Sequence, residues 1–154
     1  MPSSSFQNRP RLQSLLHLIA AATLCLSTWA VHAAATDPRG RWITASGNLE
    51  VEVAPCGQAL CGTATRVLAN RSMSPGVETM NPVDQRSPQG MTILIDFRPD
   101  DDDASQWHGQ IYNRENGKTY RCQMSLGPQG ELVLRPYIGL PLFGKTQVWQ
   151  RVQP

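Results

Sequence analysis

The sequence predicts an all-β protein folded as a single antiparallel up-and-down barrel of eight strands. Between residues 36 and 154, short apolar or alternating runs follow one another, separated by glycine, proline, asparagine and aspartate turn residues. No helical periodicity there extends beyond a few residues. Most runs are joined by tight turns, and an antiparallel sheet of this kind removes its exposed edges by closing on itself.

The first three strands are expected at residues 40–45, 49–53 and 60–68. The second of these alternates apolar and acidic residues, which is typical of a strand with one buried face and places Glu50 and Glu52 on the outward face. The third returns along the second after a turn that contains two cysteines.

One long connection, residues 69–90, separates the third and fourth strands. It holds three prolines and has no steady period. Connections of this length in compact domains are lids, binding loops or disordered segments. We expect a surface excursion that is packed by Met73 and Met80.

The remaining strands are each bounded by turn residues. Asn116-Gly117 is a favoured hairpin turn, and Pro128-Gln129-Gly130 forms the next turn. We expect these five strands at residues 91–98, 107–113, 119–126, 131–137 and 145–151.

Alternation also predicts which side chains fill the barrel, because successive side chains of a strand point to opposite faces. Arg121, Gln123, Ser125 and Arg135 are expected outside. The residues expected inside are Leu49, Val51, Val53, Ile93, Ile95, Phe97, Tyr120, Cys122, Met124, Leu126, Leu132 and Leu134.

Residues 1–35 have the layout of a secretory signal peptide. Arg9 and Arg11 precede an apolar run, and small residues follow it. The run is shorter than the roughly 20 apolar residues of a membrane span. We therefore expect cleavage after Ala33 or Ala35, a single domain over residues 36–154 without a transmembrane segment, and a periplasmic or secreted location.

The processed chain is expected to be neutral. It loses Arg9 and Arg11, which leaves 12 basic residues against 12 acidic ones. It therefore lacks the basic stripe with which nucleic-acid binders neutralise phosphates. We expect no nucleic-acid partner.

Cys56 and Cys61 lie on either side of a four-residue turn. Opposed hairpin residues bring their Cβ atoms close enough for a disulfide, and disulfides persist in oxidising compartments. We expect a structural disulfide, because redox-active pairs favour a two-residue spacer at a helix N-terminus. Cys122 is then left free among inward apolar residues, where it acts as a small hydrophobe.

The sequence marks no catalytic or metal site. His108 is the only histidine after the predicted leader, and it alternates with Trp107 onto the other face, so neither cysteine nor serine chemistry has a base. The run at residues 100–103 lacks the spaced ligands and glycine of a calcium loop, and the methionines do not cluster as copper ligands would. We expect a non-enzyme with no catalytic residues, no metal and no cofactor; the least favoured alternative is a hydrolase whose carboxylates the sequence does not mark.

Several stretches occur together in a distinctive order and spacing. They are Gly40-Arg41-Trp42, Cys56-Gly57 through Leu60-Cys61-Gly62, Ile111-Tyr112-Asn113 through Gly117-Lys118-Thr119-Tyr120, and residues 139–149. Together they resemble a family of bacterial exported proteins catalogued as domain of unknown function 2147. Asn81-Pro82 and Arg86 fit that family's middle loop, whereas residues 87–90 depart from it.

This resemblance implies a lipocalin-like barrel in the cell envelope, with no established activity. Lipocalin-like barrels carry a Gly-x-Trp in the first strand and an arginine near the end of the last strand, where the guanidinium packs on the indole. Trp42 and Arg151 occupy matching positions. The resemblance therefore implies that this pair closes the barrel bottom, which is a structural role.

The last loop, residues 139–144, holds apolar residues between two glycines. Such residues either plug the barrel mouth or meet a ligand or partner, and we expect a plug. If the mouth is open instead, the residues expected to line it are Trp107, Tyr120, Tyr137 and Phe143.

The fold and the apolar inward set favour a non-enzymatic protein of the cell envelope that binds a small apolar or amphipathic molecule. Barrels of eight strands are either filled by side chains or hold one small ligand. The alternative is a solid barrel that serves protein interaction or envelope maintenance, and that contacts an envelope protein through residues 69–90 and 139–144.

Overall fold

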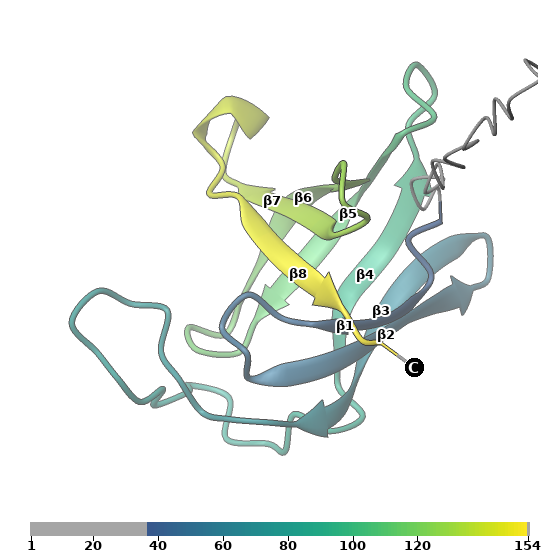
Figure 1. Cartoon of the computed structure of the whole chain (residues 1–154). Helices are drawn as coiled ribbons and strands as arrows, with labels where there is room; N and C mark the ends of the chain where they lie inside the picture. The colour runs from purple at the N-terminus through teal and green to yellow at the C-terminus, as the bar shows by residue number, and fades with distance from the viewer. Residues whose placement is uncertain (1–36, 154) are drawn as a thin grey trace, which may run out of the picture. The chain divides into compact units, whose positions relative to one another are not determined.

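The computed structural model describes residues 37–153, which form a closed barrel of eight strands, each antiparallel to its neighbours in sequence order (Figure 1). Strand β8 closes the barrel by pairing with β1 through Trp42 and Arg151. The predicted up-and-down barrel is therefore confirmed, while the predicted leader lies outside the described residues. The elements are β1 (Gly40–Ile43), β2 (Leu49–Cys56), β3 (Ala59–Val67), β4 (Thr92–Pro99), β5 (Gln106–Asn113), β6 (Lys118–Leu126), β7 (Leu132–Tyr137), the 3₁₀ turn η1 (Pro141–Phe143) and β8 (Gln147–Arg151).

The β2–β3 hairpin is tighter than the sequence predicted. Both cysteines lie within the strands, and the turn consists of Gly57 and Gln58 alone, with Gly57 at a φ of 66° that favours glycine. Cys56 and Cys61 form a disulfide with a Cα–Cα distance of 5.7 Å. Because Cys56 is opposite Ala59 and Cys61 is opposite Ala54, the bond crosses the hairpin diagonally.

Large apolar side chains fill one half of the barrel. Trp42, Phe97, Met124, Leu134 and Trp149 are among the fully buried residues of a single core cluster. Most of the predicted inward residues belong to this cluster. Those buried as predicted are Val51, Val53, Ile93, Phe97, Cys122, Met124, Leu132 and Leu134, with Leu49, Tyr120 and Leu126 partly buried against them.

Strand β4 departs from simple alternation. Gly62 pairs with Leu94 while the next residue, Thr63, pairs with Thr92, so one extra residue is inserted and both Ile93 and Leu94 are buried. A second irregularity follows, where Asp96 has a φ of 50°. The prediction that Ile95 faces inward is therefore wrong: the first bulge puts Leu94 in its place, and the second restores Phe97 to the interior.

Glu50 lies on the outward face, as alternation indicated, but it is buried there. Only 2% of the residue is exposed, because the side chains of Arg41 and Arg66 cover it. Both guanidinium groups donate to its carboxylate, at 2.9 and 3.1 Å. The carboxylate therefore clamps β1, β2 and β3 together on the outer wall.

One end of the barrel is closed by the segment that precedes β1. The Arg151 guanidinium lies 4.1 Å from the centroid of the Trp42 ring, and it donates to the carbonyl oxygens of Arg39 and Asp37. The Trp42 indole N–H donates to the Pro38 carbonyl at 2.9 Å. The pair implied by the resemblance thus holds residues 37–39 across this closed end.

Candidate site at the barrel mouth

The other end, which we call the mouth, is where four connections meet. Because adjacent strands are antiparallel, the connections at residues 44–48, 68–91, 114–117 and 138–146 emerge together. Figure 1 shows two of them projecting beyond the strands, the long one (teal) at lower left and the β7–β8 connection (yellow-green) at upper left. The mouth is therefore framed by the two loops that the sequence singled out.

The long connection is fixed at its base by Asn48, which is buried. Its side-chain amide donates to the Arg71 carbonyl and accepts from the Arg71 N–H, both at 2.7 Å. Beyond this point the chain folds into a narrow hairpin, with a bridge between Arg71 and Thr79. The connection is therefore an ordered excursion with its own hydrogen bonds.

Two carboxylates join the long connection to the β5–β6 hairpin. Ser72 and Ser74 donate to Glu115. The Tyr112 hydroxyl donates to Asp84 at 2.7 Å, and Arg86 pairs with the same carboxylate. The Arg86 guanidinium is the main reason that the pKa of Asp84 is held well below its usual range, and the Tyr112 hydrogen bond adds to it.

A pocket of about 720 Å³ opens at the mouth between these connections. Its floor contains the buried residues Ile93, Ile111 and Trp149, and Gln147 accepts a hydrogen bond from the Trp149 indole N–H. Small-molecule sites typically measure about 300–1,000 Å³ and are lined mainly by apolar and aromatic residues with a few polar ones. The volume and lining both fall within that description. The apolar and aromatic lining residues are Leu49, Val67, Ala69, Met73, Met80, Pro82, Pro88, Ile93, Ile111, Tyr112, Tyr120, Pro136, Tyr137, Ile138, Phe143 and Trp149.

Three of the four lining candidates from the sequence lie at this pocket, namely Tyr120, Tyr137 and Phe143. Trp107 does not, because it lies near the start of β5 at the closed end, where it pairs with Met124 and packs against the core. Alternation correctly places its side chain on the inward face, but alternation does not say where along the barrel axis a residue lies. Distance from the strand ends would have separated it from the other three.

Tyr112 and Trp149 are lining residues that the sequence reasoning missed. Trp149 could have been found, because it continues the inward alternation of the last strand. Tyr112 could not, since it lies next to inward-facing Ile111, and it reaches the pocket only because the long connection folds back against it.

The β7–β8 connection does not plug the barrel. Ile138, Leu140, Leu142 and Phe143 are all exposed, and the expected plug is therefore wrong. The Arg135 guanidinium explains this placement, because it donates to the carbonyl oxygens of Pro141 and Leu142 and to the Thr146 hydroxyl. These bonds hold the connection as a turn beside the mouth.

The reactive groups that the sequence considered lie away from this pocket. Cys122 is buried, and burial raises the pKa of its thiol to about 12. His108 lies on the wall near the closed end, with Nε2 2.7 Å from Asp100. Neither residue lines the pocket.

The acidic run forms the turn between β4 and β5. The Asp100 carboxylate accepts from the N–H groups of Asp102 and Asp103, which are the main cause of its lowered pKa. The Asp103 carboxylate accepts from the Ser105 hydroxyl and from the Gln106 side-chain amide. Among residues 37–153, no three histidine, cysteine, aspartate or glutamate side chains are grouped so as to hold a metal ion.

The chain belongs to the family described as "Uncharacterized protein conserved in bacteria (DUF2147)", which it matches over residues 40–151. Its fold is similar to that of protein HP1028 from the human pathogen Helicobacter pylori, described as belonging to the lipocalin family. The similarity has a TM-score of 0.57 at 20% sequence identity and covers 76% of this chain and 84% of that one. No curated protein matches the chain. Among the described residues, no helix has the length and apolar character needed to span a membrane.

Proposed function

We propose that this protein is exported to the cell envelope and binds a small apolar or amphipathic molecule in the mouth of its barrel, without catalysing a reaction. The observation that carries the proposal is the open pocket of about 720 Å³ with its mainly apolar and aromatic lining. The lipocalin-like fold supports it. A disulfide in a bacterial family fits an oxidising compartment outside the cytoplasm.

The division of the barrel into two halves also supports binding. Closely packed side chains such as Trp42, Phe97 and Leu132 occupy the half near the closed end. The pocket occupies the other half, above Ile111 and Trp149. A ligand would therefore rest on a rigid apolar floor, with polar groups available at the rim.

The test is a titration with the neutral apolar fluorophore N-phenyl-1-naphthylamine. Phe143 and Leu142 are neighbours in η1 and are equally exposed, but only Phe143 lines the pocket. Phe143→Ser should weaken binding by roughly tenfold through lost apolar contact, while Leu142→Ser should leave it unchanged. Equal effects of the two substitutions would contradict a site in the pocket.

Native mass spectrometry of the protein purified from its own compartment provides the second measurement. A stoichiometric additional mass is expected, and it should be reduced in Phe143→Ser. A clean apo mass, together with no saturable binding of the fluorophore, would overturn the proposal.

The alternative is a module for protein interaction or envelope maintenance. The exposed apolar residues around η1 favour this alternative. The open pocket argues against its premise that the barrel is solid. A protein partner that uses this loop would lose affinity with both Phe143→Ser and Leu142→Ser. The matched pair of variants therefore separates the two functions.

A further inference from the structure

We propose that the mouth end of the barrel docks on an anionic lipid surface, with the tip of the β7–β8 connection inserted among the lipid chains. The tip consists of Ile138, Leu140, Leu142 and Phe143, four large apolar side chains within six residues. Each is between 62% and 77% exposed. Exposed apolar groups gathered in this way mark interaction sites on soluble proteins.

The tip is held outward by its own framework. Arg135 donates to two carbonyl oxygens of the turn, those of Pro141 and Leu142, and the Gly144 N–H donates to Pro141 at 2.9 Å. The turn therefore presents its apolar side chains to solvent beside the open pocket. A preformed projection loses little conformational freedom when it inserts.

The charges at the two ends of the barrel are unequal. The mouth connections, residues 44–48, 68–91, 114–117 and 138–146, carry four basic and three acidic residues. The closed-end segments, residues 37–39, 57–58, 100–105, 127–131 and 152–153, carry one basic and six acidic residues. An anionic surface would attract the first end and repel the second, so the mouth would face the lipid.

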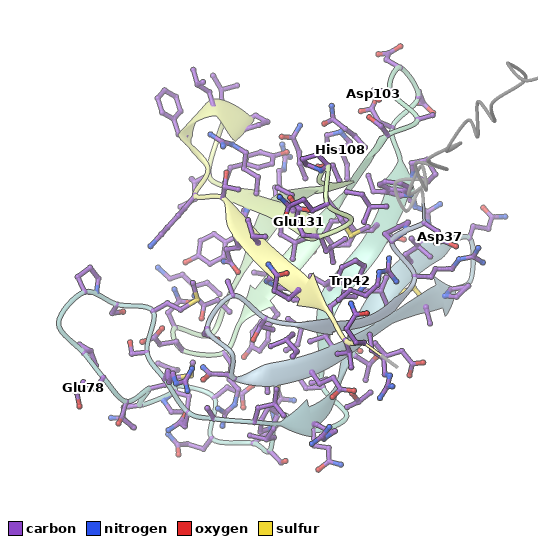
Figure 2. All side chains as sticks on the ribbon, in the orientation of Figure 1. Asp37, Trp42, Glu78, Asp103, His108 and Glu131 are labelled. Carbon is purple, nitrogen blue, oxygen red and sulfur yellow. A yellow bond between two sulfur atoms is a disulfide. The ribbon has the colours of Figure 1, made fainter. Side chains whose placement is uncertain are left out.

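The acidic residues at the mouth do not cancel this preference. Asp84 and Arg86 form an ion pair and cancel each other, whereas Glu115 keeps its charge although it accepts bonds from Ser72 and Ser74. The remaining charges of the mouth connections are those of Arg71, Arg114 and Lys145 against Glu78 and Glu115, which leaves a net positive charge. Glu78 lies on the projecting hairpin of the long connection, and Figure 2 shows it on the opposite side of the barrel from Asp103 in the acidic turn. The positive charges of two exposed side chains, Lys145 and Lys118 at the start of β6, oppose the negative charge of Glu78.

The shape of the tip favours lipid over a protein partner. The tip contributes four large side chains on one projecting turn, far fewer than the roughly 20–30 residues that each partner contributes to a stable protein complex. Shallow insertion into a membrane interface needs only a few apolar side chains with basic residues nearby. Ile138 and Phe143 also line the pocket, so, if the proposed function holds, an apolar ligand could pass between membrane and barrel without crossing water.

The experiment measures cosedimentation of the full chain with vesicles of phosphatidylglycerol and phosphatidylcholine, and with phosphatidylcholine vesicles alone. The test variant is Leu140→Ser/Leu142→Ser, which removes half of the tip but no pocket-lining residue. The control is Val148→Thr, an exposed apolar position on the β8 wall. All three proteins share the same N-terminal segment, so binding through that segment cancels in the comparison.

We expect the wild type and Val148→Thr to bind anionic vesicles equally, and the double variant to bind about tenfold more weakly or worse. Binding should weaken several-fold on neutral vesicles and at high salt. The double variant should keep its circular dichroism spectrum and its affinity for N-phenyl-1-naphthylamine, which separates docking from ligand binding.

Three results would overturn the proposal. They are no binding of the wild type to anionic vesicles, equal binding by the double variant, and equal binding to neutral and anionic vesicles. If the wild type instead fails to bind vesicles but forms a dimer in size-exclusion chromatography, and the double variant is monomeric, the tip would be a contact with a second copy of the chain.

Discussion

Asp84 connects the long loop to the pocket wall, because its carboxylate accepts from both Arg86 and Tyr112. Its pKa is lowered in the folded protein, so the stabilisation is fully present above the unfolded value near 3.8 and is lost as the pH falls through the lower folded value. Asp84→Asn should therefore lower the melting temperature most near neutral pH. The difference from wild type should shrink below about pH 4, as followed by thermal denaturation across pH.

The control for this prediction is Asp101→Asn, the same substitution at an exposed position of the acidic turn. It should leave the melting temperature nearly unchanged at every pH. If both variants behave alike, Asp84 does not anchor the loop.

Cys122 is predicted to be chemically silent in the folded protein. Burial raises the pKa of its thiol to about 12, so almost no thiolate exists at neutral pH. Dithionitrobenzoate should label this thiol only when guanidinium chloride unfolds the chain. Rapid labelling in native buffer would instead indicate that β6 opens readily.

Among the strands, the β2–β3 hairpin owes part of its stability to the disulfide. Closing so short a loop stabilises the fold by about 2 kcal/mol in the chain-entropy description. Cys56→Ser/Cys61→Ser should lower the free energy of unfolding by that amount, measured by urea denaturation. Dithiothreitol should lower the free energy of unfolding of the wild type to that of the double variant and should leave the double variant unaffected. Equal stability of both proteins without reductant would contradict a structural role for the disulfide.

Strand β4 shows what alternation can and cannot predict. The period-two pattern correctly places Ile93 and Phe97 inside, but Ile95 is wrong because two bulges lie between these residues. A bulge depends on the register of both neighbouring strands, which a single strand's sequence does not contain. The burial of Glu50 likewise cannot be predicted from the sequence of β2 alone, since it depends on Arg41 and Arg66 from two other strands.

The candidate site was predictable where it lies on strands and unpredictable where it lies on connections. Tyr120 and Trp149 can be predicted as lining residues, because alternation places both on the inward face of strands near the mouth. Met73 and Tyr112 become lining residues only through the path of the long connection, which Asn48 and Asp84 fix by contacts distant in sequence. The outward turn of η1 depends on a side chain outside the connection, because Arg135 of β7 holds its carbonyl oxygens.

At the scale of the whole molecule, the barrel has two ends with different tasks. The closed end contains the Trp42–Arg151 stack, the packed core and most of the acidic connections. The mouth contains the pocket, the apolar tip and the net positive charge. Stability and the proposed binding are therefore carried by separate parts of the chain, so substitutions at the mouth should leave the barrel folded.

This separation predicts the result of shortening the long connection. Ser72 and Glu78 are joined by a backbone hydrogen bond of 3.0 Å, so an Asn-Gly turn can replace residues 73–77 without moving the base of the hairpin. The melting temperature should stay within about 2 °C of wild type, because these residues are exposed and lie outside the core. Affinity for N-phenyl-1-naphthylamine should fall several-fold, since Met73 and Ser74 leave the pocket wall. Val77→Ser, which changes the same hairpin without removing a lining residue, should bind like wild type. A large loss of melting temperature in the shortened variant would show that the connection supports the barrel itself, and unchanged affinity would remove the long loop from the binding site.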